Sequence, residues 1–233
     1  MWTSPRASCC DALMTHERAI ALTFDDGPGP STAALLDVLV RHGARATFFV
    51  TGQSLRGHCL DGDAAHARAL ALRCLREGHV LGNHLDTHAR DPMPPAALVS
   101  ELMRVDDALR GLYATAGVAA PTSLPVRLPY GPLVRAGGAM DERLIALAAA
   151  GRTHQHWTGI FDDWEPDTDA DALADAVVAH VRGMWAEGLM AVPVLHDAGS
   201  RPRANGFDRS ATVAAVARVC EALGAEWARY VTL

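Results

Sequence analysis

The sequence predicts an α/β fold, a distorted and incomplete (β/α) barrel of about seven parallel strands. Two observations lead to this prediction. Short runs of apolar, β-branched or aromatic residues alternate strictly with longer helical patterns, which is typical of a mainly parallel sheet covered by helices. Polar motifs follow five of these runs, and a barrel gathers the ends of many strands around one mouth, whereas an open doubly wound sheet gathers its ligands at one switch point.

The expected elements follow one another as strand and helix from position 19 onward. Runs rich in β-branched and aromatic side chains predict the strands, in chain order 19–24, 47–50, 79–81, 126–128, 153–157, 190–195 and 227–232. Helical apolar spacing predicts the helices between them, at 31–42, 64–77, 96–112, 141–150, 169–187 and 210–223. Ser31 is expected to cap the first helix, and Gly43, Gly78, Gly151 and Gly224 are expected to end their helices. The count is short of a regular eightfold barrel, so we expect an incomplete one.

Composition limits the functions open to this chain. A length of 233 residues suits one large domain, and we expect a tail over residues 1–17 and a single domain over 18–233. The net charge of −6 comes without any block of Lys or Arg, which argues against nucleic acid as a partner. No apolar run approaches the roughly 18 residues of a membrane helix, so no membrane span is expected.

The first residues and the cysteines bear on the cellular compartment. Residues 1–11 contain two cysteines and lack the apolar segment that secretory signals carry. We therefore expect a cytoplasmic protein, or an exported one if an export signal precedes the sequence as given. Five cysteines without a C-x-x-C pair fit reduced thiols better than a disulfide framework. The oligomeric state is left open.

Two carboxylates and two histidines have the spacing expected of metal-assisted hydrolysis. Asp25 and Asp26 leave the first expected strand in opposite directions, so one can bind a cation while the other accepts a proton from water. The alternative for this pair is an Asx-type turn that caps the next helix. His84 and His88 lie four residues apart, and with one Asp they make a three-ligand site that leaves a coordination position open. For an isolated H-x-x-x-H, coincidence on a helix face is the alternative.

Three further motifs carry residues suited to the same chemistry. Arg127 can hold a carboxylate ionised, and the rigid turn Pro129-Tyr130-Gly131 can present a backbone N–H to a developing oxyanion. His196 suits a general acid that protonates a leaving amine. A carboxylate of Asp162-Asp163-Trp164 can orient His196, and the indole can wall a sugar pocket. The alternatives are a surface arginine, a structural histidine and a solvated acidic loop.

Taken in order, these motifs resemble those of the NodB-type polysaccharide deacetylases, carbohydrate esterase family four. The resemblance extends from about Ala19 to Leu233 and makes 18–233 a NodB homology domain. Its motifs here are 23–28, 84–88, 127–131, 162–164 and 195–197, and residues 78–84 resemble the family's approach to the second motif. The resemblance implies a distorted barrel with fewer than eight complete units. It also implies a divalent metal, zinc in the first place and Co²⁺, Mn²⁺ or Ni²⁺ otherwise, held by Asp26, His84 and His88.

The same resemblance implies a role for each remaining motif residue. Asp25 would be the general base with Arg127 as its orienting partner, and His196 would be the general acid, tuned by Asp163. Tyr130 would donate its backbone N–H to the oxyanion. The substrate-binding residues would be Pro129, Tyr130, Trp164 and Val194.

Two positions depart from the family pattern. Leu85 follows His84 where the family has Ser or Thr, so a supporting hydrogen bond is either missing or supplied by Thr87. Ile160 stands where the fourth motif has a further Asp.

The sequence as a whole predicts a metal-dependent hydrolase that removes N-acetyl groups from an amino sugar, oligosaccharide or polysaccharide. One alternative is a deformylase or amidohydrolase acting on a small soluble amide. Another is a catalytically silent carbohydrate-binding relative, although such a protein would be expected to have lost Asp25 or His196.

Overall fold

A parallel sheet forms the centre of the protein in a computed structural model that describes residues 18–90, 93–132 and 141–233. Its five strands lie in the order β4-β3-β2-β6-β5 and all pair in parallel. They are β2 (Leu22–Asp25), β3 (Ala46–Val50), β4 (Val80–Asn83), β5 (Gly159–Ile160) and β6 (Pro193–His196). Because the strands run in one direction, the residues that follow them meet at one edge. The tail expected over 1–17 lies outside the described residues.

Single parallel bridges extend this sheet into a ring. Val126 pairs with Asn83 at the end of β4 and with His154 on its other side. His154 lies shortly before β5 in the chain, so segment 154–160 joins the two edges of the sheet. Two short strands, β1 (Ala19–Ile20) and β7 (Arg229–Tyr230), pair with each other in parallel. The parallel α/β fold predicted from the sequence is confirmed, and the ring is that of a distorted, incomplete barrel.

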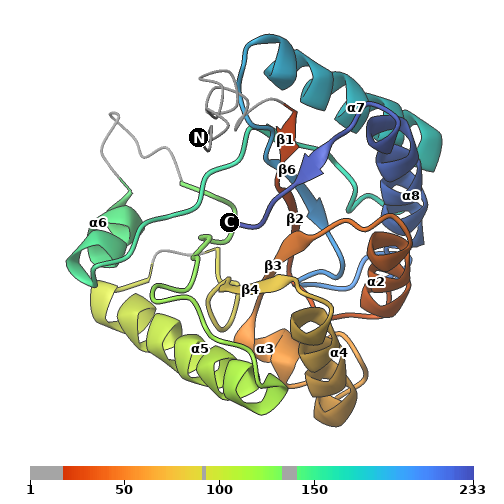
Figure 1. Cartoon of the computed structure of the whole chain (residues 1–233). Helices are drawn as coiled ribbons and strands as arrows, with labels where there is room; N and C mark the ends of the chain where they lie inside the picture. The colour runs from red at the N-terminus through yellow and green to blue at the C-terminus, as the bar shows by residue number, and fades with distance from the viewer. Residues whose placement is uncertain (1–17, 91–92, 133–140) are drawn as a thin grey trace, which may run out of the picture.

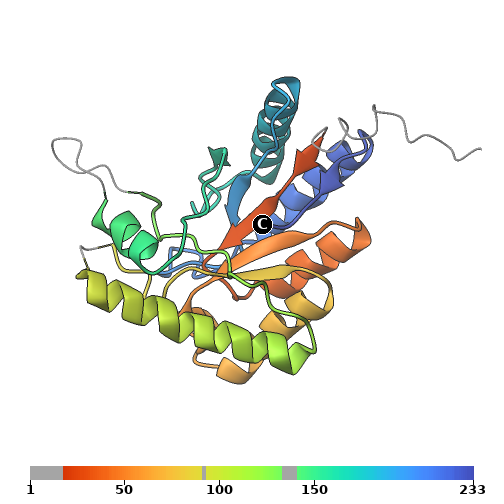
Figure 2. The same cartoon turned by 60° about the vertical axis from the view of Figure 1, so that its left-hand side comes forward.

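Helices surround the strands (Figure 1, Figure 2). Neighbours around the periphery pack in the order α6 (Glu142–Ala149), α5 (Pro95–Ala116), α4 (Ala64–Arg76), α2 (Thr32–Arg41), α8 (Ser210–Gly224) and α7 (Ala170–Ala186). A short helix, α3 (Gly52–Leu55), follows β3 directly. The main core lies between this layer and the strands, where Phe24 and Phe48 are buried. None of the described helices combines the length and apolarity needed to cross a bilayer.

The observed strands differ from the expected ones in three places. The strand expected at 19–24 is divided into β1, which pairs with β7, and β2, which pairs with β3 and β6. The strands expected at 126–128 and 153–157 contribute only single bridges, and the next strand forms at 159–160. Prolines 125 and 129 bracket the first of these segments and carry no N–H. The His154 ring also accepts the N–H of Leu128, so a continuous backbone ladder is interrupted there.

A second, smaller apolar cluster supports two segments at the carboxyl ends of the strands. Leu85, just after β4, packs in it together with Val126 and Leu128. Side chains of α5 and α6, among them Leu98 and Leu147, complete the cluster. Close packing of this kind restricts backbone movement. The segments that carry the second and third polar motifs are therefore held against two helices.

Candidate active site

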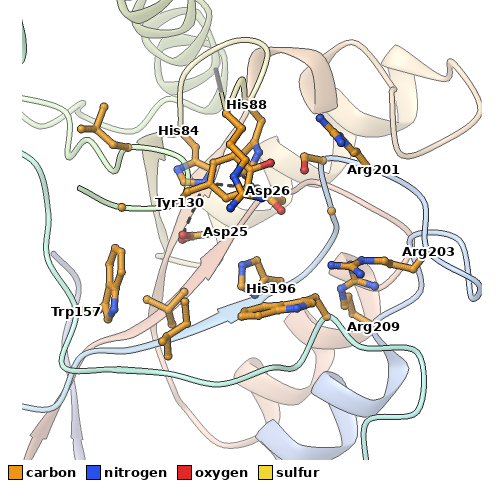
Figure 3. Close-up of a pocket in the computed structure, with 18 of the residues that line it drawn as sticks. Asp25, Asp26, His84, His88, Tyr130, Trp157, His196, Arg201, Arg203 and Arg209 are labelled. Atoms are coloured by element: carbon orange, nitrogen blue, oxygen red, sulfur yellow. Dashed lines mark ion pairs between the residues drawn. The ribbon is translucent and has the colours of Figure 1, made fainter. Parts of the chain in front are cut away.

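The predicted site residues converge on one cavity at the carboxyl ends of the strands. Asp25 ends β2 and His196 ends β6, while His84 follows β4. The cavity has a volume of about 680 Å³ (Figure 3). Seven residues of the sequence motifs line it with polar groups or rings: Asp25, Asp26, His84, His88, Tyr130, Trp164 and His196. Five separate stretches of sequence thus contribute to one site.

Asp26, His84 and His88 form a group that can hold a metal ion. One ligand atom from each of the three lies within 4.8 Å of the other two. Oδ1 of Asp26 is 3.0 Å from Nε2 of His88 and 3.4 Å from Nε2 of His84. This oxygen is buried and has no well-aligned hydrogen bond, a cost that a cation in the group would remove. Two imidazoles and one carboxylate fit a divalent metal with an open coordination position.

The protonation of these groups also suits a cation. Burial raises the pKa of Asp26, but His88 and His84 outweigh it and hold this pKa well below its ordinary value. Nδ1 of His84 lies 2.8 Å from the carbonyl oxygen of Arg127. A carbonyl only accepts hydrogen bonds, so Nδ1 carries the proton and Nε2 presents its lone pair to the group.

The segment between the two histidines is held by polar contacts on both sides. Leu85 and His88 both have a positive φ, at 61° and 52°, so the backbone turns tightly between the rings. The buried carboxylate of Glu101 on α5 accepts the backbone N–H groups of Asp86 and Thr87 and the hydroxyl of Thr87. The Thr87 hydroxyl is therefore bound to Glu101 and does not replace the hydrogen bond that Leu85 lacks.

Asp25 is held by a buried arginine. Nη1 of Arg127 donates to Oδ1 of Asp25 and to the hydroxyl of Thr23, each at 2.8 Å. Arg127 is 0% exposed, and its guanidinium lies 4.1 Å from the centre of the Phe49 ring. Oδ2 of Asp25 is 3.8 Å from Nε2 of His84, beside the candidate metal group. The reading of Arg127 as an ordinary surface arginine is thus excluded, and the ion pair leaves one carboxylate oxygen of Asp25 free to face the cavity.

His196 is paired with Asp163, as the sequence predicts. Oδ1 of Asp163 lies 2.7 Å from Nδ1 of His196, and Oδ2 accepts the His196 backbone N–H at 2.7 Å and the Thr212 hydroxyl at 2.9 Å. Burial disfavours the charged ring, but Asp163, with smaller contributions from Asp26 and Asp25, raises the pKa of His196 to about 9. The ring is therefore protonated near neutral pH, and Nε2 faces the cavity with a proton.

The turn after Arg127 presents Tyr130 to the cavity. Tyr130 has a φ of 60°, and no described residue accepts its backbone N–H. Arg143 at the start of α6 fixes this turn, since its guanidinium donates to the carbonyl oxygens of Pro129 at 2.9 Å and Gly131 at 2.6 Å. Gly131 is required in the turn, because a Cβ there would lie 2.2 Å from the Trp157 ring. A free N–H held in this way can stabilise an oxyanion.

Comparison with known proteins agrees with this geometry. Residues 13–145 match the family model described as polysaccharide deacetylase. A chitooligosaccharide deacetylase of Bradyrhizobium sp. (strain ANU 289) is 33% identical over 199 residues, which is 84% of this chain and 76% of the relative. This chain belongs to the polysaccharide deacetylase family.

Other members of the family match over most of their length. A peptidoglycan-N-acetylglucosamine deacetylase of Bacillus cereus is 31% identical over 223 residues, covering 94% of this chain and 87% of the relative. A family 4 carbohydrate esterase from Streptomyces lividans, solved in complex with acetate, superposes with a TM-score of 0.64 at 27% identity. The superposition covers 92% of this chain and 97% of the esterase chain. The resemblance inferred from the five motifs is thus confirmed.

Of the residues expected to bind substrate, Tyr130, Trp164 and Val194 line the cavity and Pro129 does not. Val194 and Trp164 line the cavity, and the Trp164 indole stands at 90° to the His196 ring with 5.2 Å between ring centres. Pro129 is not among the lining residues; its carbonyl is bound by Arg143 instead. Ile160, at the departure from the family pattern, lines the cavity and is 51% exposed.

Several residues of the site were not predicted from the sequence. Trp157 lines the cavity, and three arginines from the segment after His196 do as well, at positions 201, 203 and 209. The signal for these arginines was present, since they fall within nine residues of a chain with a net charge of −6. Arg143 could also have been noticed, because a cation in the first turn of a helix opposes the helix dipole and calls for another partner.

Proposed function

We propose that this chain is a metal-dependent N-deacetylase that hydrolyses the acetamide of an N-acetylated amino sugar in an oligosaccharide or polysaccharide. The observation that carries the proposal is the arrangement around the candidate metal group. Asp25, paired with Arg127, and His196, paired with Asp163, both border the cavity that contains Asp26 and the two histidines. The family relatives support the same class of substrate, since they are named for chitooligosaccharide and for peptidoglycan N-acetylglucosamine.

The donor set supports zinc as the resident ion. Two imidazole nitrogens and one carboxylate oxygen, with a position left open, are typical of catalytic zinc, and Co²⁺, Mn²⁺ and Ni²⁺ accept similar ligands. When bound, a divalent cation supplies Lewis-acid polarisation of the amide carbonyl and lowers the pKa of water.

The residues of this chain divide the proton transfers between them. The free oxygen of Asp25 accepts a proton from the attacking water, and the Arg127 ion pair keeps this carboxylate oriented. The backbone N–H of Tyr130 donates to the oxyanion that develops on the amide carbonyl. His196, protonated through its pairing with Asp163, delivers a proton to the departing amine. Acetate and a free amino sugar are the products.

Acetate release from N-acetylglucosamine oligomers tests this function. We expect activity with added Zn²⁺ and its loss after chelation, and we expect Asp25→Asn to lower kcat by about 10²–10⁴. Asp107→Asn, an exposed change on α5 outside the cavity, is the matched control. Acetate release that survives Asp25→Asn unchanged would overturn the mechanism. Tight binding of the oligomers without any turnover would favour a carbohydrate-binding protein instead. Release of formate from a matched N-formyl amide, with no acetate released from the oligomers, would favour a deformylase.

A further inference from the structure

The cavity carries a charge opposite to that of the whole protein. The chain has a net charge of −6. The cavity is lined by two carboxylates, those of Asp25 and Asp26, and by four guanidinium groups. Three of these arginines, Arg201, Arg203 and Arg209, lie along one side of the cavity, across from Trp157 (Figure 3). We name these three residues the arginine cluster.

Arg209 is buried without a carboxylate partner. The residue is only 3% exposed, and its Nε is buried without any hydrogen bond. Nη1 donates to the backbone carbonyl of Asp208 at 2.7 Å, while the Asp208 carboxylate is bound to Ser31 and Ser210. No described residue forms an ion pair with Arg209. Since a buried charge without a counter-charge is costly, this guanidinium is poised for an anion that enters the cavity.

The two other arginines are also largely free to bind. Arg203 has one acidic neighbour, Glu165, at 3.7 Å, and both side chains are 46% exposed, so solvent weakens the pair. Arg201 is exposed, and no described residue forms an ion pair with it. Exposed arginines at the rim of a cavity can turn toward a ligand at little cost.

The segment that bears the cluster is fixed to the rest of the fold. It connects β6 to α8 and begins directly after His196. The Cys59 thiol donates to the carbonyl oxygen of Gly199 at 3.2 Å, and the backbone N–H of Arg209 donates to the Ser31 hydroxyl at 2.7 Å. The cluster is therefore held next to the residue that protonates the leaving amine.

We infer that the arginine cluster binds an anionic substituent of the substrate, a carboxylate or a phosphate, carried by the N-acetylated sugar or by the residue next to it. This inference rests on the proposed function and narrows it to acidic amino sugars. Guanidinium groups bind carboxylate and phosphate through paired, charge-assisted hydrogen bonds. An anion placed there supplies the counter-charge that Arg209 lacks and orients the acetamide toward the metal group.

Three substrates that share one acetamide test the inference. They are the methyl glycoside of N-acetylglucosamine, its 6-phosphate and its 3-O-lactyl ether, which are neutral, phosphorylated and carboxylated. We expect kcat/KM to be at least tenfold higher for one of the anionic substrates than for the neutral one at low ionic strength. This preference should shrink on addition of salt, because screening weakens charge pairing. The better of the two anionic substrates identifies the source of the charge.

Variants then locate the effect. The Arg201→Gln/Arg203→Gln double variant should lower the ratio of anionic to neutral kcat/KM by roughly tenfold. Arg209→Gln should lower it further, and its melting temperature shows whether it is folded. Arg110→Gln, an exposed arginine on α5 outside the cavity, is the control and should leave the ratio unchanged.

The possible failures can be told apart. Turnover without a preference for the anionic substrates, or with a preference that the double variant retains, overturns the inference and leaves the proposed function standing. If no substrate releases acetate, binding of the same three compounds is measured by calorimetry. Anion-selective binding that disappears in the double variant would then support the inference while the proposed function fails, and equal binding of all three would overturn both.

Discussion

Replacing Asp163 by Asn should abolish the acid function of His196 with little change to the fold. Oδ2 of Asp163 accepts from two donors, the His196 backbone N–H and the Thr212 hydroxyl. The amide oxygen of Asn must therefore occupy this position, and its NH₂ then faces Nδ1 of His196. That ring nitrogen becomes an acceptor, so the variant favours a neutral ring with its one proton on Nε2. A neutral imidazole is a far weaker acid than imidazolium.

The structure sets the size of the effect. With a pKa of about 9, the His196 ring is about 97% protonated at pH 7.5. Without the carboxylate, burial is the largest remaining influence and lowers the pKa below its ordinary value of 6.5, so the protonated fraction falls under about 10%. The interval from 6.5 to 9 corresponds to about 3 kcal/mol. A cation beside Asp26 adds positive charge and brings the working pKa somewhat below 9. We therefore expect kcat to fall by about 10²–10³.

The assay is acetate release between pH 5 and 10, with metal content and melting temperature measured on the same samples. The wild-type rate should fall at alkaline pH as His196 loses its proton, and this limb should vanish in Asp163→Asn. Asp162→Asn is the matched control, because the neighbouring carboxylate is exposed and forms no hydrogen bond among the described residues. A variant that kept kcat within threefold of wild type, with the same pH profile, would refute the pairing as the source of acidity.

Three further predictions follow from the site. His88→Ala should weaken Zn²⁺ binding by at least about 10³-fold and remove the rise in melting temperature on adding Zn²⁺, whereas the exposed His66→Ala should do neither; equal zinc content in both variants would contradict the ligand assignment. Arg143→Lys should lower kcat by roughly tenfold with metal content unchanged, because one ammonium cannot bind the carbonyls on both sides of Tyr130; a parallel loss of metal would instead indicate general unfolding. In metal-free protein the folded-state pKa of His196 lies above 6.5, so its stabilisation is present below pH 6.5 and is lost as pH rises through about 9. The melting temperature should drop over this interval by about 6–12 °C more than that of His196→Gln, and parallel curves would disprove the coupling.

The fold was predictable where local pattern and tertiary structure agree. The helix expected at 141–150 is observed at Glu142–Ala149, since Asp141 caps it through its own side chain and Gly151 follows its end. The strands expected at 126–128 and 153–157 were wrong as strands, because ladder formation depends on neighbours that no local window contains. There the His154 ring accepts a backbone N–H that a strand would have provided to the ladder.

The site residues that lie in short sequence motifs could be predicted. The pairing of Asp25 with Arg127 across more than one hundred residues was implied by the family resemblance that the five motifs carry, and the structure places the two groups 2.8 Å apart. The part played by Arg143 could not be predicted in this way. Arg143 binds backbone carbonyl oxygens of a turn that is distant in sequence. Every residue has such a carbonyl, so no sequence motif indicates which ones a side chain will bind.

The two departures from the family pattern have different physical effects: Leu85 changes how a segment of the site is packed, and Ile160 changes the charge of the cavity. Leu85 is 3% exposed and lies in the same apolar cluster as Leu98 and Leu102, so apolar packing holds the segment between His84 and His88 in place. A Ser or Thr hydroxyl at this buried position would need a hydrogen-bond partner instead. Ile160 instead faces the cavity, where an Asp would add a third carboxylate. A carboxylate in the same cavity would attract the arginine cluster and compete with any anion for it. Ile160, in place of an acid, and the arginines that follow His196 therefore both make the cavity less negative, which favours the anionic substrates that we propose.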